Sequence, residues 1–243
     1  MATTRAGVTD PIVLRSATLP ARARRVQGNP AAAHIVVFDG ASVPAAEHWR
    51  RWGDELAAAG VTTMRTGALS PRQAEQAERA GLVCIQELAL LDLSAPFDLT
   101  RRSRRTRRLR RGELPVLARI DDAAFGARWS LDGAMLGDVC NATPVHRARV
   151  VDHAPHGAAG FLISGRAARA GYIQRLAVHP DAQRAGIGSA LLTDSLRWLA
   201  RARVSRVFVN THVDNHAALE LYRRHSFALM PDRLRVFEGP CVR

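Results

Sequence analysis

The stretch HPDAQRAGIGSALL, residues 179–192, follows an apolar segment and carries two glycines two positions apart. Pro180 cannot donate a ladder hydrogen bond, so we expect the preceding strand, residues 171–178, to end there. Gly186 and Gly188 allow a ligand to approach the backbone without an intervening Cβ atom. The helix expected to start at Gly186 presents unpaired N–H groups and the positive end of its dipole. The stretch therefore predicts a turn that binds an anion such as a pyrophosphate.

Two common phosphate-binding motifs are missing from the sequence. A G-x-x-x-x-G-K-[ST] loop is excluded because the chain has no lysine, and no G-x-G-x-x-G follows the strand. Taken alone, the Q-x-x-G-x-G pattern of residues 183–188 also fits a tight turn with a purely structural role. Other parts of the sequence must decide between these two interpretations.

The composition is that of a basic globular chain. Its 243 residues are 47% hydrophobic and carry a formal net charge of +13, which raises the local concentration of anionic partners. No segment approaches the ~20 consecutive apolar residues of a membrane span, and the first ten residues contain no apolar signal region, so we expect a cytoplasmic protein without a membrane partner. The three cysteines stand in no ligand motif, and no metal site is expected.

The order of the expected elements repeats along the chain. We expect residues 1–33 to be irregular and residues 34–100 to form a strand–helix–strand–helix–strand unit. The run VTTMRTGALSPRQAEQAERAGL from Val61 matches VSRVFVNTHVDNHAALELYRRHSF from Val204 in its strand, loop and short helix. This internal repeat predicts a tandem arrangement whose first copy lacks the Gly-x-Gly turn.

Eight arginines lie between Arg101 and Arg111, in the sequence RRSRRTRRLRR. We expect residues 101–112 to be a linker that leads into the first strand of the second domain. Such a run either contacts nucleic acid or the ribosome, or only keeps the solvent side of the linker charged. No aromatic residue is interleaved with the arginines, which counts against the binding of single strands by base stacking.

A second motif makes the anion-binding interpretation specific. RLAVHPDAQRAGIGSALL, residues 175–192, and NTHVDNHAALELYRRHSF, residues 210–227, occur in the order and at the separation found in one family. With both motifs, residues 103–238 resemble the GNAT superfamily of acetyl-CoA-dependent N-acetyltransferases, although Ser226 replaces the usual glycine. The resemblance implies an α+β chain with the GNAT fold, a mixed and mostly antiparallel sheet flanked by helices. The catalytic domain would span residues 103–243, preceded at 34–100 by a degenerate GNAT-like half domain without the cofactor turn.

The resemblance also implies a role for each matched residue. The strand backbone would pair with the pantetheine arm of acetyl-CoA, the turn would hold the pyrophosphate, and Asn215 would contact the arm. The phenol of Tyr222 would be catalytic, donating a proton to the departing thiolate, or Tyr222 is only a core residue. A backbone N–H near Leu176 would stabilise the oxyanion. The cofactor-binding residues would be Leu176, Ala177, Val178, Gln183, Arg184, Ala185, Gly186, Ile187, Gly188, Ser189 and Asn215.

One subgroup of the family fits the acceptor side best. AAFGARWSLD, residues 123–132, is similar to the Phe-Pro-Trp-Ser stretch of bacterial enzymes that acetylate the N-terminal amine of ribosomal proteins. Trp129 would lie on the substrate side, or would only cap the core between two helices. Asn210, which cannot accept a proton, replaces the glutamate base of that subgroup. His212 and Asp214 are nearby and could act through a water relay, and Gln174 would face the amine but is also neutral.

The missing base bears on the kind of amine. A free α-amine is about a quarter to a third neutral at pH 7.5, whereas a lysine amine with a pKa of ~10.4 is neutral only about 0.1% of the time. We therefore expect acetylation of a protein or peptide N-terminal α-amine, by direct attack on the thioester through a tetrahedral intermediate. The alternatives are a small-molecule amine acetyltransferase and a non-catalytic, ribosome-associated module that binds acetyl-CoA.

Overall fold

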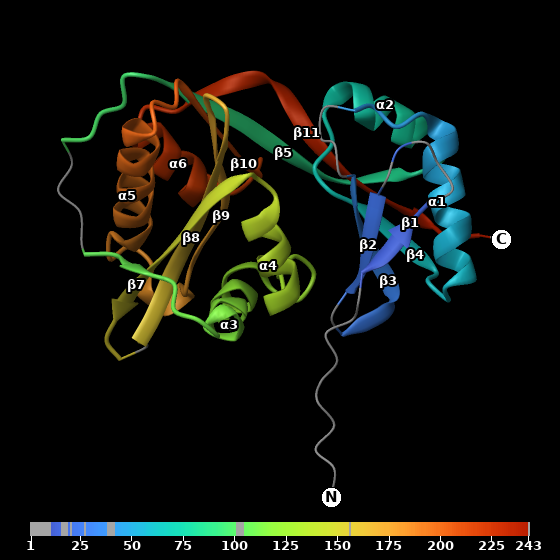
Figure 1. The fold of residues 1–243 in the computed structure, drawn as a ribbon, viewed down its shortest axis with the longest axis horizontal. Coiled ribbons are helices and arrows are strands. Elements are labelled where there is room, and N and C mark those ends of the chain that lie inside the picture. Colours follow the sequence, from blue (N-terminus) through green and yellow to red (C-terminus); the bar gives the residue numbers. More distant parts are fainter. Residues whose placement is uncertain are drawn as a thin grey trace, which may run out of the picture. The chain divides into compact units, whose positions relative to one another are not determined.

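The structure is a computed structural model that describes residues 11–15, 19, 21–26, 28–37, 42–100, 105–155 and 157–242. The chain divides into two compact units (Figure 1). The first unit contains the residues up to Ala89 together with Pro231–Arg243, and the second unit contains Leu90–Met230. Strands β5 (Val83–Ser94) and β11 (Ala228–Pro240) each include residues of both units.

The first unit is a sheet with the strand order β1-β2-β3-β4-β11, on which two helices pack. The β3–β4 pair is parallel, whereas β1–β2, β2–β3 and β4–β11 are antiparallel. Helix α1 buries Trp49, Trp52 and Leu56, which gives the unit its own hydrophobic core. The remaining bounds are β1 (Ile12–Leu14), β2 (Ala21–Val26), β3 (Asn29–Val37), α1 (Ala46–Ala58), β4 (Thr63–Thr66) and α2 (Pro71–Arg79).

The element order predicted for residues 34–100 is confirmed. The prediction that residues 1–33 are irregular is wrong for their described part, which forms β1, β2 and the start of β3. Strand β2 has the sequence ARARRV, and its fully buried positions are Ala21 and Ala23. Alanine is only weakly hydrophobic, so its alternation with arginine does not stand out as the period-two pattern of a strand.

The C-terminal segment also departs from the predicted domain boundaries. The sequence places residues 231–243 in the catalytic domain, but they group with the first unit. Their backbone pairs with β4, where Glu238 lies opposite Arg65, and the two side chains form an ion pair at 2.7 Å. A fragment of residues 100–243 would therefore leave this part of β11 without its β4 partner.

The second unit is a sheet with the strand order β5-β10-β9-β8-β7-β6. The β9–β10 pair is parallel, whereas β6–β7, β7–β8 and β8–β9 are antiparallel. Helices α3 and α4 cover one face of this sheet and α5 covers the other (Figure 1). The bounds are β6 (Arg107–Arg108), α3 (Leu114–Phe125), α4 (Gly133–Asn141), β7 (Val145–His153), β8 (Gly157–Ala167), β9 (Ala170–Val178), α5 (Ile187–Arg201), β10 (Arg206–His212) and α6 (His216–Arg224).

The predicted α+β class and the mixed, mostly antiparallel sheet flanked by helices are confirmed. The arginine-rich segment leads into β6, as expected for a linker that enters a first strand, although residues 101–104 lie outside the described part. Within the described ranges, no helix has the length and apolar character needed to cross a bilayer. Both sequence motifs, residues 175–192 and 210–227, lie in the second unit.

Trp52→Ala is expected to destabilise the first unit by about 3–5 kcal/mol, because Trp52 is fully buried in the core beside Trp49. Denaturant unfolding followed by circular dichroism measures this loss. Val36→Ala, at a largely exposed position of β3, is the control and should change the free energy of unfolding by less than about 0.5 kcal/mol. A Trp52→Ala protein as stable as the control would contradict this core.

Candidate active site

Strands β9 and β10 pair with each other over only part of their lengths. Their parallel ladder runs from Ala170 opposite Arg206 to Ile173 opposite Val209. Strand β9 nevertheless continues to Val178, and β10 also extends beyond the ladder. After Ile173, the edge of β9 that faces away from β8 has backbone N–H and C=O groups outside this ladder. A strand edge of this kind can pair with an extended ligand.

The ladder ends where β9 contains an extra residue. Ile163 of β8 lies opposite Arg175, and the next residue, Ser164, lies opposite Ile173, so Gln174 has no partner on β8. Such a β-bulge bends its strand and increases the local twist. The bulge thus accounts for the separation of β9 from β10 beyond Ile173.

Gln174 and Arg175 both extend toward the face that α3 and α4 cover. Gln174 Nε2 donates to the Val139 carbonyl oxygen at 3.0 Å, and Arg175 pairs with Asp121 of α3. Gln174 Oε1 is buried and accepts no hydrogen bond from a described residue. A Cβ atom on Gly165 would lie 2.5 Å from this oxygen, so the glycine leaves room for the amide. The amide therefore has a buried acceptor without a partner among the described residues.

The turn after β9 has the conformation of an anion-binding turn. A 3₁₀ turn, Pro180–Ala182, follows the strand, and Gly186 then begins α5 with a φ of +78°. Arg184, whose side chain is exposed, has a φ of +61°. The backbone N–H groups of residues 184–189 donate to no acceptor in the described ranges, and they lie at the positive end of the α5 dipole. These are the donors that a pyrophosphate requires.

Two glycines let this turn lie close to the sheet and to α6. A Cβ atom on Gly160 of β8 would be 2.7 Å from Ile187 Cγ2 and 3.2 Å from the Ala177 carbonyl oxygen. A Cβ atom on Gly188 would be 3.2 Å from Leu221 Cδ2. Gly188 is therefore needed for helix packing as well as for access to the backbone.

Two polar side chains of the turn are oriented by their neighbours. Ser189 Oγ lies 2.9 Å from Nε2 of His225, a residue that is only 5% exposed. Gln183 Nε2 donates to the Val178 carbonyl oxygen at 3.5 Å, which is a long contact. The sequence indicates Ser189 and Gln183 but contains no signal for the buried histidine beside them.

Asn215 and Tyr222 lie toward opposite ends of α6. Asn215 Oδ1 accepts a hydrogen bond from the Ala218 N–H at 3.1 Å and caps the helix, which leaves the side-chain NH₂ group as a donor. Tyr222 is 4% exposed and packs against Phe227, with 5.6 Å between the ring centroids. Burial raises the pKa of the Tyr222 phenol. At neutral pH the group is therefore protonated and can act as a proton donor.

Two of the polar side chains expected on the substrate side are neutral amides, and two further polar groups lie near them. Asn210 is exposed, and its amide cannot take a proton. His212 Nδ1 accepts a hydrogen bond from the Asp214 N–H at 3.0 Å, so the neutral ring carries its proton on Nε2. Asp121 is a nearby carboxylate. It is fully buried and forms an ion pair with Arg175, the residue after Gln174.

Trp129 lies in the loop between α3 and α4. Its carbonyl oxygen accepts a hydrogen bond from Arg175 Nη2 at 2.9 Å, and its N–H donates to the Gly126 carbonyl oxygen at 3.0 Å. The side chain is partly exposed and is not among the residues of the hydrophobic core under α3 and α4. The substrate-side role of Trp129 stays a prediction.

The second unit thus combines a free strand edge, a turn of unpaired N–H groups and a buried phenol. The sequence of residues 117–227 matches the acetyltransferase (GNAT) family. Residues 117–227 are a GNAT acetyltransferase domain. The protein is therefore an acyltransferase that uses acetyl-CoA, as members of this family do. The strand edge and the turn both lie inside the matched residues and have donors suited to the arm and the pyrophosphate of that cosubstrate.

Solved GNAT structures share the fold over most of the chain. A tandem GNAT protein from the clavulanic acid biosynthesis pathway is 14% identical with a TM-score of 0.62, and the match covers 93% of this chain and 79% of that one. GCN5-related N-acetyltransferases from Kribbella flavida and Sphaerobacter thermophilus are 12% and 15% identical, with TM-scores of 0.61 and 0.59. They cover 95% and 92% of this chain, and the matches span 90% and 77% of theirs. No curated protein matches the sequence. The tandem structure supports the half domain that precedes the GNAT domain.

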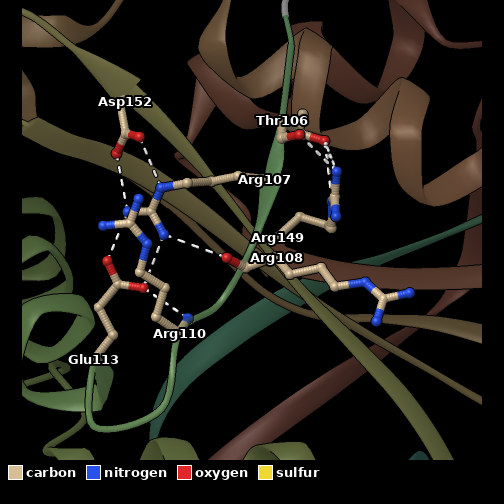
Figure 2. Close-up of polar contacts among 7 residues, drawn as sticks. All are labelled: Thr106, Arg107, Arg108, Arg110, Glu113, Arg149 and Asp152. Atoms are coloured by element: carbon tan, nitrogen blue, oxygen red, sulfur yellow. Dashed lines mark hydrogen bonds and ion pairs between the residues drawn. The ribbon is translucent and has the colours of Figure 1, made fainter.

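The described part of the arginine-rich segment contains engaged and free arginines (Figure 2). Arg107 lies between two carboxylates, at 2.6 Å from Glu113 and 2.7 Å from Asp152. Its hydrogen bonds lower the pKa of both carboxyl groups. In Figure 2 the side chain of Arg108 extends away from this network. The arginines that are exposed and form no ion pair with a described residue are Arg105, Arg108, Arg110 and Arg111, and of these the charge of Arg110 also lowers the pKa of Glu113 and Asp152.

Gly160→Ala is expected to raise the KM for acetyl-CoA by about tenfold or more, because the new methyl group meets Ile187 and the backbone of Ala177 and displaces the turn. Initial rates at varied acetyl-CoA measure the change. Gly67→Ala is the matched control, because its Cβ atom would meet no atom closer than 4.0 Å. A KM equal to that of the unmodified enzyme would show that the turn does not depend on this contact.

Proposed function

We propose that the enzyme transfers the acetyl group of acetyl-CoA to the N-terminal α-amine of a peptide or protein. The observation that carries the proposal is that neutral amides occupy the two positions closest to the expected base, while His212 and the exposed Asp214 lie further along the chain. Asn210 and Gln174 are neutral amides, His212 uses Nδ1 to accept a backbone hydrogen bond, and Asp121 is occupied by Arg175. An acceptor that is already partly neutral at physiological pH suits such a site.

The neutral fractions of the two common protein amines differ greatly. At pH 7.5 the fraction of a free α-amine that is neutral exceeds that of a lysine amine by about two orders of magnitude. A strong base removes this difference by deprotonating either amine, but a site with weak bases retains it. The site should therefore favour α-amines by a factor of this order.

In this proposal the chain holds acetyl-CoA mainly through its backbone. The free edge of β9 at Leu176, Ala177 and Val178 pairs with the pantetheine arm, and the side-chain NH₂ group of Asn215 donates to the arm. The unpaired N–H groups at the start of α5 hold the pyrophosphate, with the charge of Arg184 beside them. The turn residues are Gln183, Arg184, Ala185, Gly186, Ile187, Gly188 and Ser189.

Two groups act on the reaction itself. Acetyl-CoA supplies an activated acyl carbonyl at its thioester. The Leu176 N–H, on the free edge beyond the bulge, donates to the carbonyl oxygen as negative charge develops there. The open Oε1 atom of Gln174 accepts an N–H of the attacking amine, and the Tyr222 phenol gives its proton to the thiolate that leaves.

Tyr222→Phe is expected to lower kcat by about a hundredfold and to leave the KM for acetyl-CoA unchanged, because it removes only the proton donor. The control is Tyr172→Phe, a change at the other tyrosine of the chain, which stacks on Phe208. Because burial raises the pKa of Tyr222 above its ordinary value, the phenol stays protonated up to at least about pH 10, and kcat should show no falling limb from this group below that pH. Unchanged turnover in Tyr222→Phe would remove the phenol from the mechanism.

The acceptor class is tested with two matched peptides and a thiol-release assay. One peptide has a free α-amine and no lysine, and its twin has a blocked N-terminus and one lysine. We expect turnover on the first to exceed that on the second by about two orders of magnitude at pH 7.5. The chain contains no lysine, so self-acetylation cannot imitate lysine turnover.

Turnover of the lysine peptide alone would contradict the proposal and require a base that the described groups do not supply. A rate that is nil on both peptides but substantial on spermidine would favour a small-molecule amine instead. Acetyl-CoA binding without turnover of any amine would favour a binding module.

We also propose that the free arginines of the segment contact the backbone of RNA. Arg108 lies opposite Arg149 in the β6–β7 register; the Arg149 guanidinium is bound by Thr106 and Asp194, whereas that of Arg108 is exposed. Burial lowers the pKa of Arg147 on the same strand, and Arg149 and Arg108 lower it further, against the opposing effect of Asp194. Positive charge is therefore in excess here, and arginine forks suit phosphate oxygens.

Replacing Arg105, Arg108 and Arg111 by glutamine should weaken binding to a mixed-sequence single-stranded RNA. The slope of log K against log salt concentration should become less steep by about 2, because each lost phosphate contact contributes about 0.7. The slope is measured by filter binding at salt concentrations between about 50 and 200 mM. The control removes the same charge at arginines that already have ion pairs: Arg79, Arg223 and Arg233. Equal slopes for the two triple variants would contradict an RNA contact at this segment.

A further inference from the structure

A buried ion pair in the second unit has no part in the chemistry described above. Asp121 of α3 is 0% exposed, and its two carboxylate oxygens accept hydrogen bonds from Nε and Nη2 of Arg175 at 2.7 and 2.6 Å. The Leu131 N–H donates to the same carboxylate at 2.7 Å. A buried carboxylate is costly unless it is paired and hydrogen-bonded, and this one is fully provided with donors.

Arg175 connects this carboxylate to the loop that carries Trp129. Its Nη2 atom also donates to the Trp129 carbonyl oxygen at 2.9 Å, and its guanidinium carbon lies 3.7 Å from the centroid of the Phe125 ring. Only the planar fork of arginine can make these contacts together, since a lysine ammonium is a single point charge. Two points of the loop, at Trp129 and Leu131, are thus fixed to one strand residue and its partner.

That strand residue adjoins the bulge. Arg175 follows Gln174, whose amide has the open acceptor, and precedes Leu176, whose N–H we assign to the thioester carbonyl. Because the backbone is continuous, a displacement of Arg175 would displace both neighbours. The ion pair therefore links the loop between α3 and α4 to the two groups that act at the reacting atoms.

We propose that Asp121 and Arg175 are a positioning pair that fixes the loop of residues 126–132 against β9 and so sets where the acceptor amine lies. The inference rests on the proposed function in placing this loop on the acceptor side. A pair that only stabilised the fold would affect the kinetics of both substrates together. A positioning pair affects the amine far more than acetyl-CoA, because the printed contacts of the pair lie on the α3–α4 side and, among the described residues, none of them is to the turn of residues 183–189.

Arg175→Lys tests the pair, because it keeps the charge and removes the fork. Kinetics are measured with the acceptor that the unmodified enzyme turns over fastest among the α-amine peptide, the lysine peptide and spermidine. We expect kcat/KM for that amine to fall by about tenfold to a hundredfold, while the Kd of acetyl-CoA by calorimetry rises far less, because only the adjacent Leu176 connects the pair to the cosubstrate. The matched control is Arg206→Lys, which alters the ion pair with Asp92 in the same unit and should change neither value.

A double-mutant cycle with Trp129→Ala separates positioning from general stabilisation. If Arg175 acts through the Trp129 loop, Arg175→Lys should reduce kcat/KM far less in a Trp129→Ala background than in the unmodified enzyme. Should Arg175→Lys fail to fold, Asp121→Glu, which keeps the charge and lengthens the side chain, is measured in the same way.

Additive effects in the cycle, or a proportional loss of acetyl-CoA affinity and amine turnover, would overturn the positioning pair. So would unchanged amine kinetics in a folded variant. A preference of the unmodified enzyme for spermidine or for the lysine peptide would instead contradict the α-amine proposal. In that case kcat/KM for the preferred amine and the Kd of acetyl-CoA would still decide the role of the pair.

Discussion

The early end of the ladder between β9 and β10 is the constraint on which the active site depends. Two parallel strands that are paired along their whole length have no free backbone groups for a ligand. Here the extra residue Gln174 bends β9 after Ile173, and the strand continues to Val178 with one edge outside the ladder. The free edge and the entry into the turn before α5 follow from this one irregularity, and so does the oxyanion donor that we propose.

Small residues then determine how closely the surrounding elements can approach that edge. Gly160 admits Ile187 of α5 over β8, Gly188 admits Leu221 of α6, and Gly165 leaves room for the Gln174 amide. Because these glycines have no Cβ atom, a helix end or a polar side chain can lie close to the free edge of β9. In the proposed mode of binding, acetyl-CoA is held mainly by backbone donors, and most side-chain chemistry is on the acceptor side.

The sequence predicts the elements of the second unit well, because its motifs combine a strand, a proline and a glycine turn in one short stretch. It also indicates Asn215 and Tyr222, since α6 begins with a capping asparagine. It does not predict the Asp121–Arg175 pair, whose members lie 54 residues apart and belong to no spacing pattern. It equally misses β2, because alanines at its buried positions give no hydrophobic signal among arginines.

Hydrogen exchange of the full chain with and without acetyl-CoA tests the central claim most directly. The account predicts that acetyl-CoA slows exchange at the backbone amides within residues 174–178 that face away from β8 and at those of residues 184–189, and leaves the amides of the first-unit strands β2 and β3 unchanged. Slowed exchange confined to the first unit, or no change at residues 174–178 at saturating acetyl-CoA, would contradict a cosubstrate held by the separated edge of β9.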